Sequence, residues 1–248
     1  MNERLLGYFH EIEKIHWWWE GRRQILRQSI ERKPEQKILD IGCGTGETLT
    51  FLENYLERPD LYGVDNLPAA IDFAKKRGHK NILKVDAQKL PFKDNTFDYV
   101  LFLDVIEHIK DDVAILSEAK RVLKKGGRII ITTPALQFIW SDHDTEQGHY
   151  RRYTRRRMRD LGKKTRLAID QMSYFNFFLS PGIIFLRLLG RLKPFKSVNS
   201  YDSKLNYDVA KKSLVNDILK HIFVGEIKLM KYFSYPIGIS IFTILRKK

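Results

Sequence analysis

Three aspartates lie at or near the ends of three short apolar stretches. Asp40 lies within the stretch 38–41, Asp65 follows 61–64, and Asp86 follows 82–85. These stretches are rich in Ile, Leu and Val, as buried parallel strands are. Because parallel strands end at one edge of a sheet, we expect the carboxylates to line a single ligand crevice there.

The first stretch runs into a loop with a glycine at every second position. Residues 38–46 read ILDIGCGTG, with Gly42, Gly44 and Gly46. Without a Cβ, glycine lets the backbone approach a nucleotide-like ligand closely. Dinucleotide enzymes carry GxGxxG instead, and Asp40 would repel a pyrophosphate. The same acid would attract an ammonium or a sulfonium, and Asp65 could accept from both ribose hydroxyls. The loop therefore favours a cationic nucleoside cofactor.

Five segments carry a family resemblance: ILDIGCGTG, YGVD, KVDAQKLPF, FDYVLFLDVIEHI and LKKGGRIIITTP. Together they span roughly 36–134 and resemble the class I S-adenosylmethionine-dependent methyltransferases, type 11 small-molecule branch. The resemblance implies S-adenosyl-L-methionine as cofactor and a set of residues around it. They are Asp40, Gly42, Cys43, Gly44 and Gly46 at the methionine end, Asp65 and Asn66 at the ribose, Asp86 and Ala87 at the adenine, Leu103, Asp104 and His108 near the sulfonium, and Trp17, Arg22 and Arg23 before the first strand.

Strand and helix patterns alternate after position 34. Strands are predicted at 37–41, 61–64, 81–85, 98–103 and 128–132, with helices at 46–57, 68–77 and 111–124 between them. Two further strands, 167–174 and 238–245, would pair antiparallel at the sheet edge, as in the family it resembles. The pattern predicts an α/β fold with a doubly wound, mostly parallel seven-stranded sheet, Rossmann-like, whose last strand is antiparallel.

Four parts of the chain are expected from this pattern. They are an N-terminal helical cap (1–34), a cofactor-binding α/β core (35–174), a helical insertion (175–235) and the last strand (236–248). In the cap, the run HWWWEGRR at 16–23 interrupts a helix predicted over 3–32. Three adjacent tryptophans cannot all face one core, so at least one is expected to contact a ligand or a partner.

The insertion combines apolar helices with cations. Residues 175–189 are apolar but broken by Pro181-Gly182, with Arg191, Lys193 and Lys196 following, and an amphipathic helix is predicted at 208–232. Two interpretations stay open. The helices form a plain cap over the active site, or they hold a lipid-linked substrate and contact an anionic membrane.

The composition of the chain says more about its cellular location than about its substrate. The 248 residues have 43% hydrophobic content, a single cysteine and a net charge of +14. One cysteine allows no internal disulfide, and no apolar run approaches the ~18 residues of a spanning helix. We expect a cytoplasmic protein that can contact the inner face of the membrane peripherally. The charge favours an anionic partner or is simply a solvated basic surface.

The loop at 134–153 follows the fifth strand and is expected to hold the substrate. A hydroxyl or amine acceptor needs a base, and histidine is the usual one near neutral pH. We rank His149 first, His143 second and His108 third. The predicted substrate contacts are Trp140, His143, His149, Tyr150, Arg152 and Tyr153. The spacing of Asp142, His143 and Asp144 is too tight for a metal set, so no metal is predicted.

These observations predict methyl transfer to a small or lipid-linked metabolite at oxygen, nitrogen or carbon. A nucleic-acid methyltransferase is an alternative prompted by the charge. The Asn/Asp-Pro-Pro-aromatic motif of exocyclic-amine methylases is replaced here by Leu-Asp-Val-Ile-Glu, and the one cysteine lies in the glycine loop. A non-catalytic S-adenosylmethionine-binding protein is the second alternative. The oligomeric state is not predicted.

Overall fold

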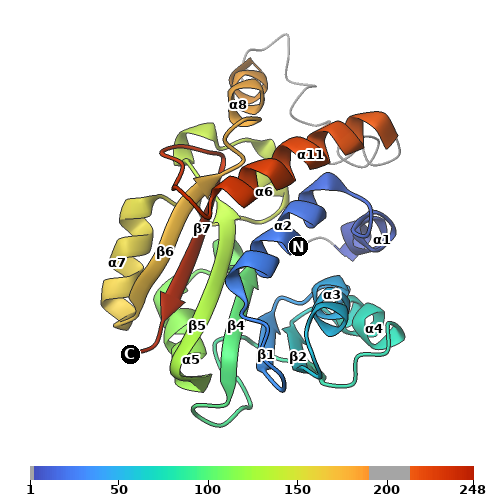
Figure 1. Ribbon diagram of the computed structural model, residues 1–248, viewed down its shortest axis with the longest axis vertical. Helices are drawn as coiled ribbons and strands as arrows, with labels where there is room; N and C mark the ends of the chain where they lie inside the picture. The colour runs from blue at the N-terminus through green and yellow to red at the C-terminus, as the bar shows by residue number, and fades with distance from the viewer. Residues whose placement is uncertain (1–2, 190–212) are drawn as a thin grey trace.

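The computed structural model describes residues 3–189 and 213–248 (Figure 1). A seven-stranded sheet forms its centre, in the order β3-β2-β1-β4-β5-β7-β6. Strands β1 to β5 pair in parallel, and β7 lies antiparallel between β5 and β6. This confirms the predicted fold class. The strands are β1 Lys37–Ile41, β2 Asp60–Asp65, β3 Ile82–Lys84, β4 Phe97–Leu103, β5 Leu123–Pro134, β6 Ala168–Phe175 and β7 Ser240–Arg246.

Helices connect and cover the strands. α5 and α7 pack on each other, and α2 packs on α3. Thr154 accepts a hydrogen bond from the backbone N–H of Arg157 and so caps α7. The helices of this part are α1 Glu3–Ile12, α2 Trp17–Ser29, α3 Glu47–Tyr55, α4 Pro68–Lys76, α5 Asp112–Val122 and α7 Arg155–Thr165.

The central strands are apolar because helices cover both of their faces. Val100 and Leu101 of β4 and Ile130 of β5 are fully buried. β5 is longer than the predicted 128–132. It begins at Leu123, and its register against β4 shifts between Phe97 and Tyr99, so the residues around Gly126 form a bulge rather than a loop before the strand.

Two helices occupy the predicted helical segment 3–32, and the tryptophan run begins the second of them, so the interruption lies before the run and not at 16–23 as predicted. The ring nitrogen Nδ1 of His16 accepts from the Trp18 N–H at 3.1 Å and caps the helix. Trp17 is buried, and Trp18 stacks on Phe223 of α11 with ring centroids 5.4 Å apart. Tryptophan packing therefore fixes the cap against the insertion.

The insertion contributes α8 Ser180–Leu189 and α11 Ser213–Leu229, between β6 and β7. Pro181 lies in the first turn of α8, where its missing N–H costs no helical hydrogen bond, so it starts this helix rather than breaking it. The predicted residues 208–212 and the cations at 191, 193 and 196 lie outside the described residues. The division of the chain at 34, 174 and 235 stays a prediction.

α11 lies across α2 at one end of the sheet (Figure 1). Asn216 holds the two together: its Oδ1 accepts from the Trp17 N–H at 2.9 Å, and its Nδ2 donates to the Ile15 carbonyl. A Cβ on Gly21 would lie 2.1 Å from the Phe223 ring, so the helices approach closely only because this residue is glycine. Within 3–189 and 213–248, the helices lack the length and apolarity that crossing a bilayer requires.

Candidate functional site

A cavity of about 1630 Å³ opens where β1 to β4 end, and α1, α2, α8 and α11 contribute to its walls. Ligand pockets usually measure ~300–1,000 Å³. The cavity is therefore large enough for a nucleoside cofactor and a second molecule. The predicted site residues that line it are Trp17, Arg22, Gly42, Cys43, Gly44, Asp65, Asn66, Asp86, Ala87, Leu103, Asp104, His108, His149, Tyr150 and Arg152.

The glycine loop borders the cavity in a left-handed conformation. Gly42 has a φ of +70°, and a Cβ there would lie 2.5 Å from the Val105 side chain. Gly44 has a φ of +52°, and nothing in the described chain lies within 4 Å of where its Cβ would be. Gly46 does not line the cavity and instead makes the turn into α3. Burial raises the pKa of the Cys43 thiol well above its ordinary value, and the charges of Asp40 and Asp65 add to the effect.

Asp65 fixes the loop to the end of β2. One of its oxygens accepts from the Gly44 N–H at 3.0 Å, and the other accepts from the Leu67 N–H at 3.0 Å. Each carboxylate oxygen retains a second lone pair for a ligand hydroxyl. Asp40 is buried and is not among the described residues that line the cavity. Burial raises the pKa of Asp40 to about 7, against the opposing charge of Arg22.

Arg22 and Arg23 have different surroundings. Arg22 lines the cavity, and its Nη1 lies 3.5 Å from Oδ2 of Asp104. Arg23 does not line it among the described residues: its Nε donates to Glu20, and its Nη1 donates to the Glu13 carbonyl at 2.9 Å. Asp104 has a φ of +59°, a conformation that non-glycine residues adopt mainly where the surroundings impose it. Of the two predicted arginines, only Arg22 is placed to contact a ligand.

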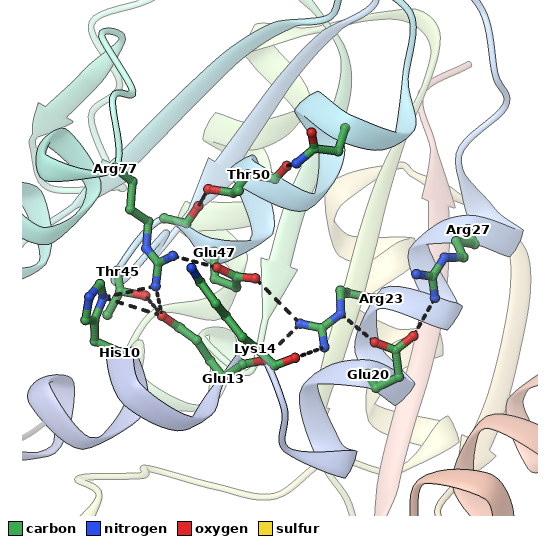
Figure 2. A network of polar contacts seen from close by, with 12 residues as sticks. His10, Glu13, Lys14, Glu20, Arg23, Arg27, Thr45, Glu47, Thr50 and Arg77 are labelled. Atoms are coloured by element: carbon green, nitrogen blue, oxygen red, sulfur yellow. Dashed lines mark hydrogen bonds and ion pairs between the residues drawn. The ribbon is translucent and has the colours of Figure 1, made fainter.

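A polar network joins the N-terminal helices to the glycine loop (Figure 2). Glu13 accepts from the Thr45 hydroxyl at 2.5 Å and forms an ion pair with Arg77 of the segment after α4. Arg77 also contacts Glu47 at 2.7 Å, and Glu47 lies 3.9 Å from Arg23. Glu13, Thr45 and Glu47 line the cavity, yet sequence reasoning missed them. Thr45 lies within the glycine loop, but no sequence motif marks Glu13 or Glu47, since the contacts of both acids with Arg77 form only in the tertiary fold.

A second buried network holds the loop after β5. The fully buried Asp144 accepts from Arg152 through Nε at 2.8 Å and Nη2 at 2.9 Å, and from the Ser141 N–H. It also contacts His149 Nδ1 at 2.9 Å. Burial acts to raise the pKa of Asp144, but the hydrogen bonds from His149 and Arg152 and the charge of Arg152 hold it well below its usual range. Asp144 lies in α6, Asp142–Glu146, and was not predicted to act here.

The remaining predicted substrate contacts separate into two groups. Tyr150 and Arg152 line the cavity. Trp140 and Tyr153 do not, within the described part of the chain: Trp140 donates to Thr145, and the Tyr153 hydroxyl contacts the Ile106 carbonyl and Asp112 at 3.2 Å. The side chain of His143 lies outside what the structure describes.

Two of the predicted histidines meet at the cavity. The rings of His108 and His149 are 4.7 Å apart in a T-shaped arrangement, and Glu107 lies beside them. Glu107 and His108 belong to the short turn η1, Ile106–His108, that follows β4. Burial lowers the pKa of His108 to about 4, so its ring is neutral at pH 7. Burial also raises the pKa of Glu107 well above its usual value, with the charge of Asp104 adding to the effect.

Comparisons with known proteins agree with this geometry. The profile of a family described as "Methyltransferase domain" matches residues 39–131. A ubiquinone/menaquinone biosynthesis C-methyltransferase of Desulfotalea psychrophila is 36% identical over 42% of this chain and 45% of that protein. A sterol 24-C-methyltransferase of Gibberella zeae is 32% identical over 51% of this chain and 35% of that protein.

The solved structures share the fold. Phosphoethanolamine N-methyltransferase 2 of Haemonchus contortus, in complex with phosphomonomethylethanolamine and S-adenosylhomocysteine, matches with a TM-score of 0.63. The identity is 21%, and the match covers 100% of this chain and 58% of that one. This chain spans about half the length of the curated relatives it matches, 46% and 58% in two of them.

Sheet order, glycine loop and the row of carboxylates define an α/β domain that binds a nucleoside cofactor at the carboxyl ends of its strands. The profile match and the matched relatives make the assignment more specific. Residues 39–131 are similar to the methyltransferase domain of the class I S-adenosylmethionine-dependent enzymes, and the described chain shares the fold of such an enzyme.

Proposed function

We propose that this protein transfers the methyl group of S-adenosylmethionine to a small, largely apolar acceptor bound between the cofactor and the insertion. The observation that carries the proposal is the composition of the cavity wall. Carboxylates and the glycine loop line it together with apolar side chains of other elements. The apolar side chains include Trp18 of α2, Leu179, Ile183 of α8 and Leu219 of α11.

The residues present fit this cofactor. S-adenosylmethionine carries an ammonium and a sulfonium, and Asp65, Asp86 and Asp104 bring negative charge to the cavity. Oδ2 of Asp104 is buried and lies 3.5 Å from Nη1 of Arg22, but it accepts no hydrogen bond in the described chain, so a ligand donor could satisfy it. When bound, the cofactor supplies the electrophilic methyl group. The protein aligns the acceptor with it, which gives much of the acceleration in such a transfer.

A polar acceptor atom would also need to lose a proton, and His149 is the best-placed base. Asp144 is ionised at neutral pH, so it accepts the Nδ1 proton of the neutral ring and puts the ring's lone pair on Nε2. This is the arrangement that orients a general-base histidine. Arg152 holds Asp144 in place and thereby positions the ring.

Replacing His149 is expected to lower turnover. His149→Ala should reduce kcat about 100-fold or more for a hydroxyl or amine acceptor, while the affinity for S-adenosylmethionine changes little. Single-turnover kinetics and equilibrium dialysis measure the two quantities separately. Thermal unfolding serves as the control, because the variant also removes one contact of Asp144. Unchanged kcat in a folded variant would eliminate His149 as the base.

The proposed function is tested by methyl transfer from labelled S-adenosylmethionine to a fractionated cell extract, followed by partition of the products. Label in the organic phase supports an apolar acceptor, as the names of the quinone and sterol relatives suggest. Label in aqueous small molecules keeps the methyltransferase and rejects the apolar acceptor. Label in nucleic acid supports the alternative prompted by the net charge of +14. Tight cofactor binding with no labelled product supports a non-catalytic binding protein.

We further propose that the insertion contacts an anionic membrane from which an apolar acceptor could enter. Part of the apolar stripe of α11 packs into the protein core, where Phe223 and Ile227 are buried. The other part faces outward: Leu214 is 74% exposed and Ile218 51% exposed. Phe185 of α8 is exposed as well, and the exposed Lys228 and Lys231 lie in and after α11. Exposed apolar side chains with nearby cations are typical of helices that lie on membranes.

Vesicles test this contact directly. The protein should co-sediment with vesicles of anionic phospholipid at low salt, and a Leu214→Ser/Ile218→Ser variant should lose most of that binding. Leu83→Ser, at an exposed apolar residue of β3, is the matched control and should bind like the parent. Equal binding of both variants, or none by the parent, would contradict the proposal.

A further inference from the structure

Three ligating side chains converge on the cavity wall where β4 and β5 end. Glu107, His108 and His149 each offer one metal-ligating atom, and these atoms all lie within 4.8 Å of one another. Ligands around one divalent ion at ~2.0–2.2 Å lie about 3–4 Å apart, so atoms within 4.8 Å of one another would need to approach by at most about 2 Å. From this geometry we propose that Glu107, His108 and His149 form a binding site for a divalent transition-metal cation.

Two of the ligands have orphaned polar atoms. Oε1 of Glu107 and Nδ1 of His108 are both buried, and neither has a hydrogen-bond partner in the described chain. Glu107 itself is 1% exposed. Buried polar atoms are rarely left unsatisfied, because each costs about 1–3 kcal/mol. A cation that these two atoms ligate would give each of them a partner.

Neighbouring side chains hydrogen-bond to the ligands and fix their orientation, as they do in known metal sites. The Thr133 hydroxyl donates to Oε2 of Glu107 at 2.9 Å. Asp144 accepts from Nδ1 of His149, which places the lone pair of the neutral ring on Nε2. A carboxylate behind a ligating histidine and a hydroxyl on a ligating carboxylate are the partners that fix metal ligands in place. Arg152 and Ser141 hold Asp144 in turn.

The donor set indicates the class of cation. Two imidazoles and one carboxylate suit Zn²⁺, Co²⁺ or Fe²⁺, whereas Mg²⁺ prefers oxygen ligands alone. Three protein ligands leave further coordination positions, and all three residues line the cavity. An acceptor oxygen could occupy an open position there. A ring that binds the metal is not available as the base, so with the cation bound His149 is a ligand and no longer the general base proposed above.

The consequence for the reaction rests on the proposed function. An acceptor hydroxyl bound to the cation would have a lowered pKa. Its O–H bond breaks and the proton passes to water, while a bond forms between that oxygen and the methyl carbon. The methyl–sulfur bond breaks and its electron pair stays on sulfur, which leaves neutral S-adenosylhomocysteine. The metal site would therefore select acceptors with an oxygen nucleophile.

Cobalt binding tests the site without requiring turnover. The protein is treated with chelator, dialysed, and titrated with Co²⁺ alone by visible absorption and with Zn²⁺ alone by calorimetry. We expect one equivalent of each per chain. Glu107→Gln, His108→Ala and His149→Ala should each weaken binding at least about tenfold. His221→Ala is the matched control and should bind like the parent, since this exposed histidine of α11 contacts the Asp217 carbonyl and does not belong to the ligand cluster.

A milder variant guards against misfolding of the ligand variants. Thr133→Val keeps every ligand and removes only the hydroxyl that donates to Glu107, so cobalt affinity should fall about 10–100-fold. The site would be overturned if the parent protein did not bind one equivalent of cobalt. It would also be overturned if Thr133→Val and all three ligand variants bound cobalt as tightly as the parent does. Measuring the affinity for S-adenosylmethionine in the presence of chelator, without bound metal, distinguishes failure of the metal site from failure of the proposed function. Cofactor binding and methyl transfer without cobalt binding reject the metal site alone, and cobalt binding without methyl transfer rejects the proposed function alone.

Discussion

Asp144→Ala is expected to lower the free energy of unfolding by about 3–5 kcal/mol, because it leaves the Arg152 guanidinium buried without its carboxylate. Arg152 is 5% exposed, and its two hydrogen bonds to Asp144 are bidentate. Its remaining described contact is with the Ala135 carbonyl. The Ser141 N–H would also lose its acceptor. Since 3–5 kcal/mol is a large part of the stability of an ordinary domain, we expect partial unfolding at growth temperature.

Urea unfolding followed by tryptophan fluorescence measures this change. Asp170→Ala is the matched control, because Asp170 pairs with Arg246 at 2.9 Å on an accessible part of the sheet edge. Surface ion pairs contribute about 0–1 kcal/mol, so this variant should unfold almost like the parent. If Asp144→Ala and Asp170→Ala unfolded at the same urea concentration, the Asp144 network would not be the main support of the loop after β5.

The cofactor half of the site could be predicted because its signals are local. The glycine loop, Asp65 and Asp86 each follow an apolar strand directly, and a parallel sheet places strand ends together. The two antiparallel strands at the edge were expected from the resemblance, and β7 does lie between β5 and β6. Strand lengths were less predictable, since the bulge near Gly126 depends on register against β4.

The polar contacts that Glu13, Asp144 and His149 make around the cavity could not be predicted, because most of them depend on the tertiary fold. Glu13, which follows α1, meets Arg77 and Thr45 only in the folded chain, and Figure 2 shows these contacts. In the sequence, nothing distinguishes Asp144 from the other acids of its polar loop. Its importance follows from its burial beside Arg152 in the folded chain. The ligand cluster depends on the same loop, since His149 reaches His108 only through it. Burial, rather than sequence spacing, gives these side chains their chemistry.

Gly44→Leu is expected to abolish most cofactor binding while leaving the fold intact. In the described chain, no atom lies within 4 Å of where a Cβ at Gly44 would be, so the side chain meets space that the cofactor would use. The left-handed φ of +52° adds about 1–2 kcal/mol of strain, which a domain of this size tolerates. Overlap with a ligand costs about 1–3 kcal/mol or more, so affinity for S-adenosylmethionine should fall roughly 10–100-fold.

Gly78→Leu is the control that distinguishes steric overlap with the cofactor from the backbone strain of a leucine at a positive φ. Gly78 follows α4, has a φ of +97°, and also has no described neighbour within 4 Å of its Cβ position, but it does not line the cavity. Both variants should lose similar stability in thermal unfolding, and only Gly44→Leu should lose cofactor affinity by calorimetry. Equal affinity in the two variants would mean that the cofactor does not approach the backbone at Gly44. A glycine at every second position would then serve the turn into α3, and the carboxylates at the strand ends alone would have to hold the ligand.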